Sequence, residues 1–178
     1  MHQVLPSFRS CFFCGTGNRS GLHIRYHHDP DRDRVYGSVT PDSKLCGYPD
    51  VLHGGIQAAL LDDVMFWAVA HHHATSCATL ELTCTYHTPA ALGQAFELEA
   101  TAGTADGRKA RAKGRLLSSG GAVVASARAL YLLHSPERFR TDVLPLLDFE
   151  GCKPAMAEHF SNSRPVPTAA TGKLGEAR

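Results

Sequence analysis

Hydrophobic and polar positions alternate with two different periods along the chain, and each period predicts a different element. In residues 21–40, apolar side chains recur at every second position on both sides of a charged turn at 29–34, which predicts a hairpin of two strands. Residues 51–74 contain no proline and carry their glycines only at the start, which predicts one long helix. A period of two then returns in three stretches, the last of them divided at residues 118–121: 77–88, 94–101 and 109–133. The predicted order is two strands, a helix and four strands.

The predicted helix is apolar in nearly every direction around its axis. The side chains that make it so are Ile56, Ala59, Leu60, Leu61, Val64, Met65, Phe66, Trp67, Val69 and Ala70. Such a helix must be buried on several sides, so we expect the strands to wrap around it. The pattern therefore predicts an α+β fold with a long central helix wrapped by an antiparallel sheet.

Both ends of the chain differ in composition from this core. Ser135 can cap a short amphipathic helix that has Pro136 at its first position. The last 18 residues have almost no large apolar side chain and predict a disordered tail. We therefore divide the chain into an N-terminal extension, a core domain, a C-terminal helical extension and a tail, at residues 1–19, 20–134, 135–160 and 161–178.

Composition and charge narrow the class of partner. With 178 residues and 43% hydrophobic content, the chain is long enough for one well-buried core. The 18 Lys and Arg residues balance 17 acidic ones, so we expect neither nucleic acid nor a membrane surface as a partner. No apolar run approaches the roughly 20 residues of a membrane span, and the six cysteines lack the dense spacing of a disulfide scaffold. These features predict a cytoplasmic protein with reduced thiols.

The start of the predicted helix has the composition of an anion-binding site. Gly54 and Gly55 follow His53, and two glycines let another group approach the backbone closely. The free amides at a helix start, reinforced by the helix dipole, suit a developing negative oxygen. The segment therefore predicts an oxyanion hole.

One acidic residue within the helix is a candidate catalytic group. Asp62 lies among apolar residues, where a carboxylate costs free energy unless it is paired, hydrated or used. The alternatives are an aspartate at a gap in the packing, or Asp63 as the acid. Gly55 and Asp62 lie about 10 Å apart along the helix axis, so one carbonyl cannot easily reach both. If both act on one carbonyl, the simplest arrangement is a twofold dimer with a shared site.

The cysteines and the histidine triplet do not predict a metal site. Cys11 and Cys14 have the spacing of a zinc knuckle, but two further ligands are needed, and only Cys46 and scattered histidines are available. Residues 71–73 are three consecutive histidines, which point in different directions around a helix and so make a poor chelate. Their position predicts the C-terminal end of the helix, where they complement its dipole. We therefore expect no metal and no catalytic cysteine.

At the helix start the sequence resembles a known family, the PaaI-like hotdog thioesterases. The helix of that family opens with His-Gly-Gly and carries an acid nine positions after the histidine, which is Asp62 here. The resemblance also includes the stretch 11–15 with Asn18 and Gly21-Leu22, then 47–49, and it ends near Leu133. It covers roughly two thirds of the chain.

The resemblance implies a hotdog fold, dimers or tetramers built from dimers, an acyl-coenzyme A substrate and no required cofactor. It implies that an acid acts as nucleophile or general base and that a helix-start amide holds the thioester carbonyl. The corresponding residues are Asp62 as the acid, Gly55 or Gly54 as the amide, His53 beside it, Thr79 to orient the water and Tyr48 as a substrate contact. Many members have an asparagine where this chain has Gly47.

We therefore expect an acyl-coenzyme A thioesterase. The alternatives are a non-catalytic acyl-coenzyme A-binding or regulatory protein, and a hydratase, for which the usual aspartate and histidine after a strand are missing. Basic side chains on one face of 109–115 face an acidic strand at 97–101, and they either contact coenzyme A phosphates or form a solvated, salt-bridged surface. We favour the salt-bridged surface.

Overall fold

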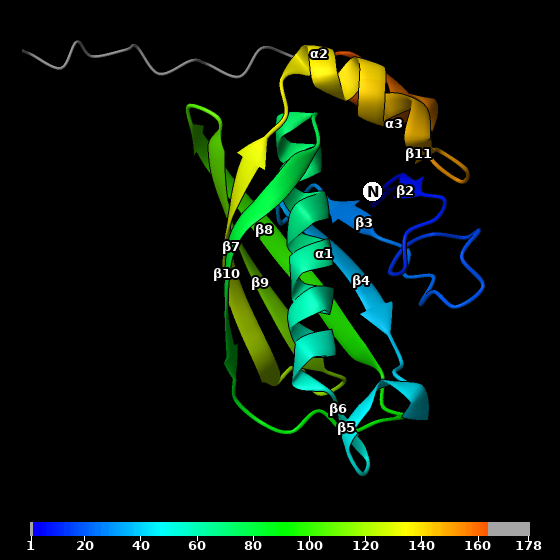
Figure 1. Cartoon of the computed structure of the whole chain (residues 1–178), viewed down its shortest axis with the longest axis vertical. Coiled ribbons are helices and arrows are strands. Elements are labelled where there is room, and N and C mark those ends of the chain that lie inside the picture. The colour runs from blue at the N-terminus through cyan, green and yellow to red at the C-terminus, as the bar shows by residue number, and fades with distance from the viewer. Residues whose placement is uncertain (1, 164–178) are drawn as a thin grey trace, which may run out of the picture.

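A curved antiparallel sheet of seven strands wraps one long helix, α1 (Gly54–His73) (Figure 1). This computed structural model describes residues 2–163. In spatial order, the strands are β1 (Gln3–Val4), β3 (His27–Asp29), β4 (Arg34–Val39), β8 (Phe96–Asp106), β9 (Lys109–Ser118), β10 (Val123–Leu133) and β7 (Cys77–Tyr86). The predicted fold class is confirmed.

The remaining elements are short. Two small pairs lie outside the main sheet: β2 (Ser7–Phe8) with β11 (Leu147–Asp148), and β5 (Cys46–Tyr48) with β6 (Val51–Leu52). The other helical elements are η1 (Ser43–Leu45), α2 (Pro136–Arg138), η2 (Phe139–Val143), η3 (Leu144–Leu146) and α3 (Pro154–Ser161).

Helix α1 is buried on several sides, as its composition predicts. Leu60, Leu61, Val64 and Met65 are all fully buried. The face of the sheet toward the helix is built from small residues, which let the helix approach closely: Ala100, Ala110, Ala112, Gly114, Ala125, Ala127 and Ala129. A Cβ atom at Gly114 would lie only 2.9 Å from Met65 Cγ, so a larger residue there would displace the helix.

The first strand of the predicted hairpin is shorter than expected. Only His27–Asp29 pairs with β4, although Ile24 is buried on the predicted face. The preceding amides bond elsewhere, since Leu22 N–H donates to Phe12 O at 2.8 Å and Ile24 N–H to Phe13 O at 2.8 Å. The N-terminal loop thus takes the hydrogen bonds that a longer strand would have used.

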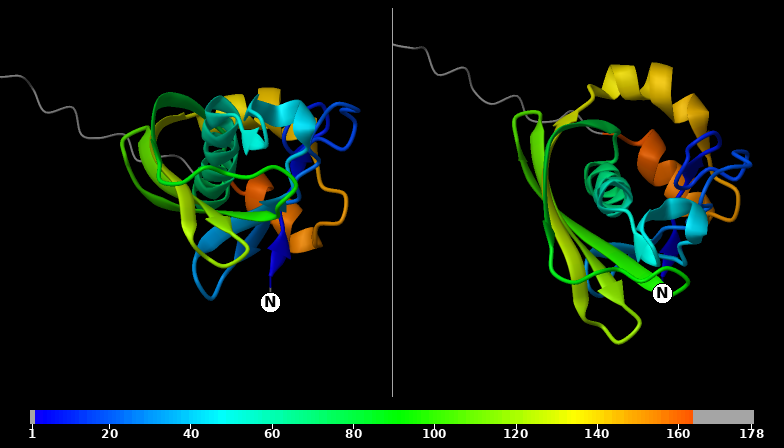
Figure 2. Two further views of the ribbon diagram at one scale, coloured as in Figure 1. Left: turned by 90° about the horizontal axis from the view of Figure 1, so that it is seen from below. Right: turned by 60° about the horizontal axis from the view of Figure 1, so that its bottom comes forward.

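The N-terminal loop and the C-terminal helical segment, as far as residue 163, cover the side of α1 that faces away from the sheet (Figure 2). Ser135 caps α2 as predicted, because its side chain accepts a hydrogen bond from Arg138 N–H at 3.2 Å. Phe160 of α3 is buried, and α3 ends at Ser161, the first residue of the predicted tail. The rest of that predicted tail, 164–178, lies outside the described residues.

Candidate active site

Asp62 lies in the middle of α1 and is held by two hydroxyl groups from the sheet. Thr79 Oγ1, on β7, donates to Asp62 Oδ1 at 3.0 Å and to Oδ2 at 3.2 Å. Tyr131 Oη, on β10, donates to the same Oδ1 at 2.9 Å and lies 3.0 Å from the Asp62 backbone oxygen. Thr79 and Tyr131 are register partners on adjacent strands, which explains why both reach one carboxylate.

Both donors to Asp62 are neutral. Burial, together with the charge of Asp62, raises the pKa of Tyr131 well above its usual value, so its hydroxyl stays protonated. Among residues 2–163 no lysine or arginine forms an ion pair with Asp62. The carboxylate is thus fixed in orientation without a cation to neutralise it.

Tyr131 is not among the site residues that the sequence predicts. A signal for it exists, because the inward positions of β10 are otherwise small or apolar, and Tyr131 brings the one hydroxyl among them. Its partnership with Asp62 depends on the register between β10 and β7, which includes a bulge at Leu130 and Tyr131. Alternation in the sequence does not give that register.

His53 caps the N-terminal end of α1. His53 Nδ1 accepts a hydrogen bond from Gly55 N–H at 2.9 Å, so the predicted Gly55 amide is already occupied. Gly54 N–H has no hydrogen-bond partner in the part of the chain that the structure describes. The free amide at the helix start is therefore that of Gly54.

A pocket of about 650 Å³ opens beside this helix start. Its lining includes the predicted residues Tyr48, His53 and Gly54, and the side chain of Gln57. Gln57 is buried and donates to Leu52 O at 3.0 Å, while its Oε1 is left without a partner. The pocket therefore has apolar walls and polar groups at the helix start, as small-molecule sites usually do.

Gly47, where many members of the PaaI-like family have an asparagine, lies in close contact with His53. A Cβ atom at this position would lie 3.1 Å from both Cα and Cδ2 of His53. The loop therefore passes directly over the histidine, and a larger side chain would have to push it aside. Gly47 lines the same pocket as His53.

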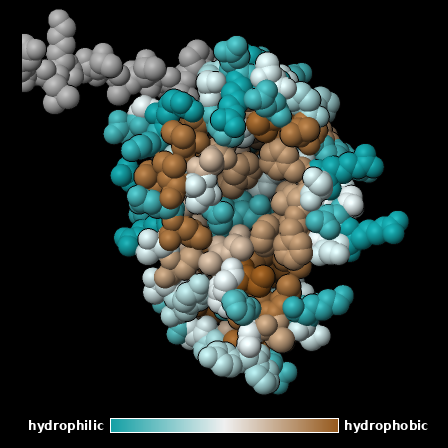
Figure 3. Space-filling model, in the orientation of Figure 1, coloured by the Kyte–Doolittle hydropathy of each residue, from teal (hydrophilic) through white to brown (hydrophobic). Residues whose placement is uncertain are grey.

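Strand β7 connects the two ends of the site. It begins near Asp62, through Thr79, and ends near Gly54, whose carbonyl oxygen accepts a hydrogen bond from Tyr86 Oη at 2.9 Å. β7 is also the last strand of the sheet, and its apolar side chains Leu80 and Leu82 are exposed. Figure 3 shows apolar side chains gathered around a polar centre on the face where α1 and β7 lie.

Asp62 and Gly54 of one chain do not converge. Eight residues separate them, which corresponds to about 12 Å along a helix axis. The structure thus brings Asp62 together with Thr79, and His53 together with Gly54, Gly55 and Tyr48, as two separate groups.

The charged strands form ion pairs on the sheet face away from α1. Glu99 lies opposite Arg115 in the register and forms an ion pair with it, and Arg34 contacts both Glu97 and Glu99. These contacts agree with the salt-bridged interpretation. The same face also has Lys113 directly opposite Arg128 beside a cavity of about 730 Å³.

A long helix in a curved antiparallel sheet, with an acid at mid-helix and glycines at its start, defines a hotdog protein. The sequence profile of the thioesterase superfamily matches residues 50–125, which hold the helix start, Asp62 and Thr79. The chain belongs to the thioesterase superfamily.

Solved structures agree with this assignment. A crystallised thioesterase-superfamily protein is 30% identical over 56% of this chain and 76% of its own, with a TM-score of 0.52. A second one is 27% identical, covers 70% of this chain and 60% of its own, and has a TM-score of 0.64. A Streptococcus mutans protein crystallised with acetyl CoA shares the fold at 17% identity and a TM-score of 0.54, over 57% of this chain and 82% of its own.

Two curated relatives come from yeasts. An uncharacterized Schizosaccharomyces pombe protein is 32% identical over 48% of this chain and 51% of its own length. The uncharacterized mitochondrial membrane protein FMP10 of Saccharomyces cerevisiae is 29% identical over 54% of this chain and 41% of its own. The chain thus spans about half the length of the curated relatives it matches.

The second relative bears on location. Because FMP10 is a mitochondrial membrane protein, it contradicts the predicted cytoplasmic location, which we withdraw. Among the described residues, no helix has the length and apolar character needed to cross a membrane.

Proposed function

We propose that this chain is a PaaI-like thioesterase that hydrolyses an acyl-coenzyme A thioester to a free acid and coenzyme A. The observation that carries the proposal is the Asp62 carboxylate, which α1 supplies and which Thr79 and Tyr131 orient with neutral hydroxyl groups. A carboxylate held in this way suits a general base or a nucleophile.

In the general-base form of the reaction, Asp62 takes a proton from water while the water oxygen attacks the thioester carbonyl. The carbonyl oxygen becomes negative and is stabilised by Gly54 N–H and the positive end of the α1 dipole. The C–S bond then breaks, and the proton passes to the departing thiolate. In the nucleophilic form, the Asp62 carboxylate attacks the thioester carbonyl and the C–S bond breaks, so that coenzyme A leaves as the thiolate and takes up a proton. Water then hydrolyses the resulting anhydride to the free acid and the Asp62 carboxylate.

His53 has a defined part in this proposal. Its Nδ1 accepts the Gly55 amide, so in the neutral ring the proton is on Nε2. That N–H is a second donor at the helix start. His53 would thus help Gly54 to hold the carbonyl oxygen.

A dimer through the free edge of β7 would unite the two separated groups. Antiparallel pairing about a twofold axis near the middle of β7 places the Thr79 end of one strand beside the Tyr86 end of the other. Asp62 of one copy then approaches Gly54 of the partner subunit. The exposed Leu80 and Leu82 would be covered in the same step.

Structures with bound ligands support the choice of substrate. The Streptococcus mutans protein holds acetyl CoA, and a hypothetical thioesterase from Streptococcus pneumoniae holds coenzyme A. Acyl-coenzyme A is therefore the substrate class to test first. The chemistry outlined above uses no metal and no cofactor.

The second candidate is a non-catalytic acyl-coenzyme A-binding protein. The observation that favours it is Gly47, which lies against His53 where many PaaI-like members have an asparagine. Without that side chain, a bound thioester would have one fewer polar contact to orient it.

A thiol-release assay over acyl-coenzyme A substrates of increasing chain length separates the two candidates. We expect turnover by the wild type and a loss of about two to four orders of magnitude in Asp62→Asn, because the base is removed. Glu137→Gln, an exposed carboxyl-to-amide change on α2 away from β7 and the site, should keep full activity. Binding of acyl-coenzyme A without any release of coenzyme A would favour the second candidate.

A further inference from the structure

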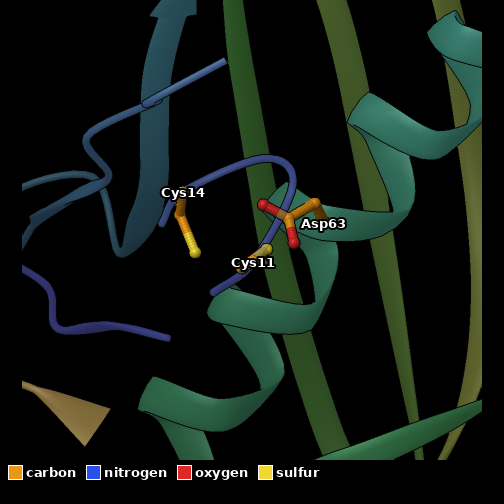
Figure 4. A group of neighbouring side chains, drawn as sticks. All are labelled: Cys11, Cys14 and Asp63. Atoms are coloured by element: carbon orange, nitrogen blue, oxygen red, sulfur yellow. The ribbon is translucent and has the colours of Figure 1, made fainter. Parts of the chain in front are cut away.

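Three potential metal ligands from distant parts of the sequence meet on the side of α1 away from the sheet. They are Cys11 and Cys14 in the N-terminal loop and Asp63 on the helix, and their ligand atoms all lie within 4.8 Å of one another. Figure 4 shows the three side chains pointing toward one another. Sequence reasoning missed this group because it sought cysteine or histidine ligands for the pair.

The loop holds its two sulfur atoms in a tight turn. Phe13 N–H donates to Cys11 Sγ at 3.3 Å, and Gly15 N–H donates to Cys11 O at 3.1 Å. A Cβ atom at Gly15 would lie 2.5 Å from Cys11 O and 2.6 Å from Arg9 O, so only glycine fits this turn.

Polar atoms in this cluster are buried without partners. Asp63 Oδ2 and Tyr26 Oη are both inaccessible, and neither makes a hydrogen bond of ordinary geometry, although the Tyr26 hydroxyl lies close enough to the carboxyl group to interact with it. Tyr26 is 1% exposed. Buried polar atoms normally have a partner, so these atoms point to a group that completes the site.

The acidic groups of this cluster are not balanced by a cationic side chain in the described part of the chain. Two thiols and a carboxyl group converge, yet among residues 2–163 no lysine or arginine forms an ion pair with Asp63. A divalent cation would supply the missing positive charge.

We propose that Cys11, Cys14 and Asp63 bind a zinc ion that fastens the N-terminal loop to helix α1. This proposal departs from the expectation from sequence that the chain binds no metal. Two thiolates and one carboxylate are ligands that zinc accepts.

The spacing fits such an ion. At bond lengths of about 2.0–2.3 Å, two sulfurs and one oxygen around a tetrahedral zinc lie roughly 3.5–3.8 Å apart, so no pair needs to close by more than about 1.3 Å. Cys14 is buried, and the loop backbone is already fixed by hydrogen bonds to residues 22 and 24. The fourth position borders the Tyr26 hydroxyl and suits a water molecule or that oxygen.

The zinc site is separate from the proposed catalytic carboxylate. Successive helix residues point about 100° apart, so Asp63 faces the loop while Asp62 faces β7 and β10. We therefore assign the ion a structural role. It would replace the missing hydrogen bonds of Asp63 and stabilise the folded chain, because the unfolded chain does not hold the three ligands together.

The first test is metal content. The full chain, purified in reductant without chelator, should contain about one zinc per chain by mass spectrometry of the elements. Cys11→Ser and Asp63→Asn should each lower that content at least about tenfold, since each removes one of three ligands. Cys46→Ser, a matched change at an exposed cysteine outside the cluster, should retain the metal.

A second measurement does not depend on the folding of any variant. Wild-type protein stripped with chelator should melt about 5–10 °C lower and recover when zinc is restored. Cobalt in place of zinc should give the thiolate-to-metal absorption and the tetrahedral spectrum of a sulfur-bound site. Absence of metal from both purified and reconstituted protein, or a Cys11–Cys14 disulfide in its place, would overturn the proposal.

Discussion

Two neighbouring carboxylates on α1 have different surroundings. Asp62 is held by the hydroxyl groups of Thr79 and Tyr131, whereas Asp63 faces two thiols and has an oxygen without a partner. Their different directions on the helix account for this difference. Two adjacent acids of the same chemistry can thus serve two separate sites.

Tyr131 should act by positioning Asp62. We expect Tyr131→Phe to lower kcat by about 10- to 100-fold with little change in KM, because a hydrogen bond to a charged group is lost and the ring still fills the core. Steady-state kinetics on the best acyl-coenzyme A substrate would measure this split.

Two further variants make the Tyr131 result specific. Thr79→Val removes the other hydroxyl and should give a drop of similar size. Tyr36→Phe, a matched change away from Asp62, should leave kcat unchanged. Equal losses of kcat in Tyr36→Phe and Tyr131→Phe would contradict a positioning role.

At this scale the sequence predicts residues whose chemistry is unusual for their place. An acid in an apolar helix and glycines at a helix start are visible as such, so Asp62, Gly54 and His53 can be singled out. Tyr131 cannot, because a tyrosine in a strand is ordinary, and Asp63 stands out only as an alternative to Asp62 and not as a partner of the cysteines. Their partners come from strand register and from a loop some 50 residues away.

At the C-terminal end of α1, the side chain of His71 is packed between other elements. His71 packs against the rings of His28 at 4.1 Å and His159 at 4.6 Å between ring centroids. His159 Nε2 also lies 2.7 Å from His71 O and ties α3 to this end of the helix. The sequence assigned the triplet to the helix dipole; the structure adds that its first member is packed between other elements.

His71 should make the fold sensitive to acid. Burial, reinforced by the charges of His28, His159 and His72, lowers the pKa of His71 to about 3. Between pH 6.5 and about 3 the unfolded chain then binds more protons than the folded one, so stability falls as the pH falls through this range. Urea unfolding at a series of pH values would measure this slope.

His71→Phe should flatten that slope, because the ring remains and the titrating group is gone. His72→Phe is the matched control, since His72 is exposed, and it should keep the wild-type slope. An unchanged slope in His71→Phe would show that another group is responsible for the loss of stability.

The periodic parts of the chain were predictable as elements, and the irregular parts were not. The alternation in residues 109–133 gives β9 and β10 and the break between them. The alternation in residues 22–26 is equally clear, yet these residues form no ladder, because their amides bond to the loop that holds Cys11 and Cys14. A pattern of buried side chains does not say which backbone group is the partner.

For the whole molecule, the shared site can be tested by mixing two inactive variants. Asp62→Ala lacks the acid, and Gly54→Val would fill the pocket in front of the amide. After unfolding and refolding together, half of the dimers in a statistical mixture are mixed, and each holds one intact site. We expect activity to recover to about one quarter of the wild-type value.

The activity of the refolded mixture is interpreted together with the fraction of mixed dimers that it contains. Native mass spectrometry would show whether mixed dimers form. If they form and the mixture remains inactive, Asp62 and the helix-start amide act within one chain, and the proposed dimer arrangement is wrong. Each variant refolded alone provides the baseline.

The free edge of β7 has a consequence for how such a protein would be controlled. If each site needs residues from two copies, an isolated chain is inactive however well it folds. Dilution would then lower the turnover per chain, and a rise in expression would increase total activity more steeply than the amount of protein. The concentration of the protein would then control how much of it is active.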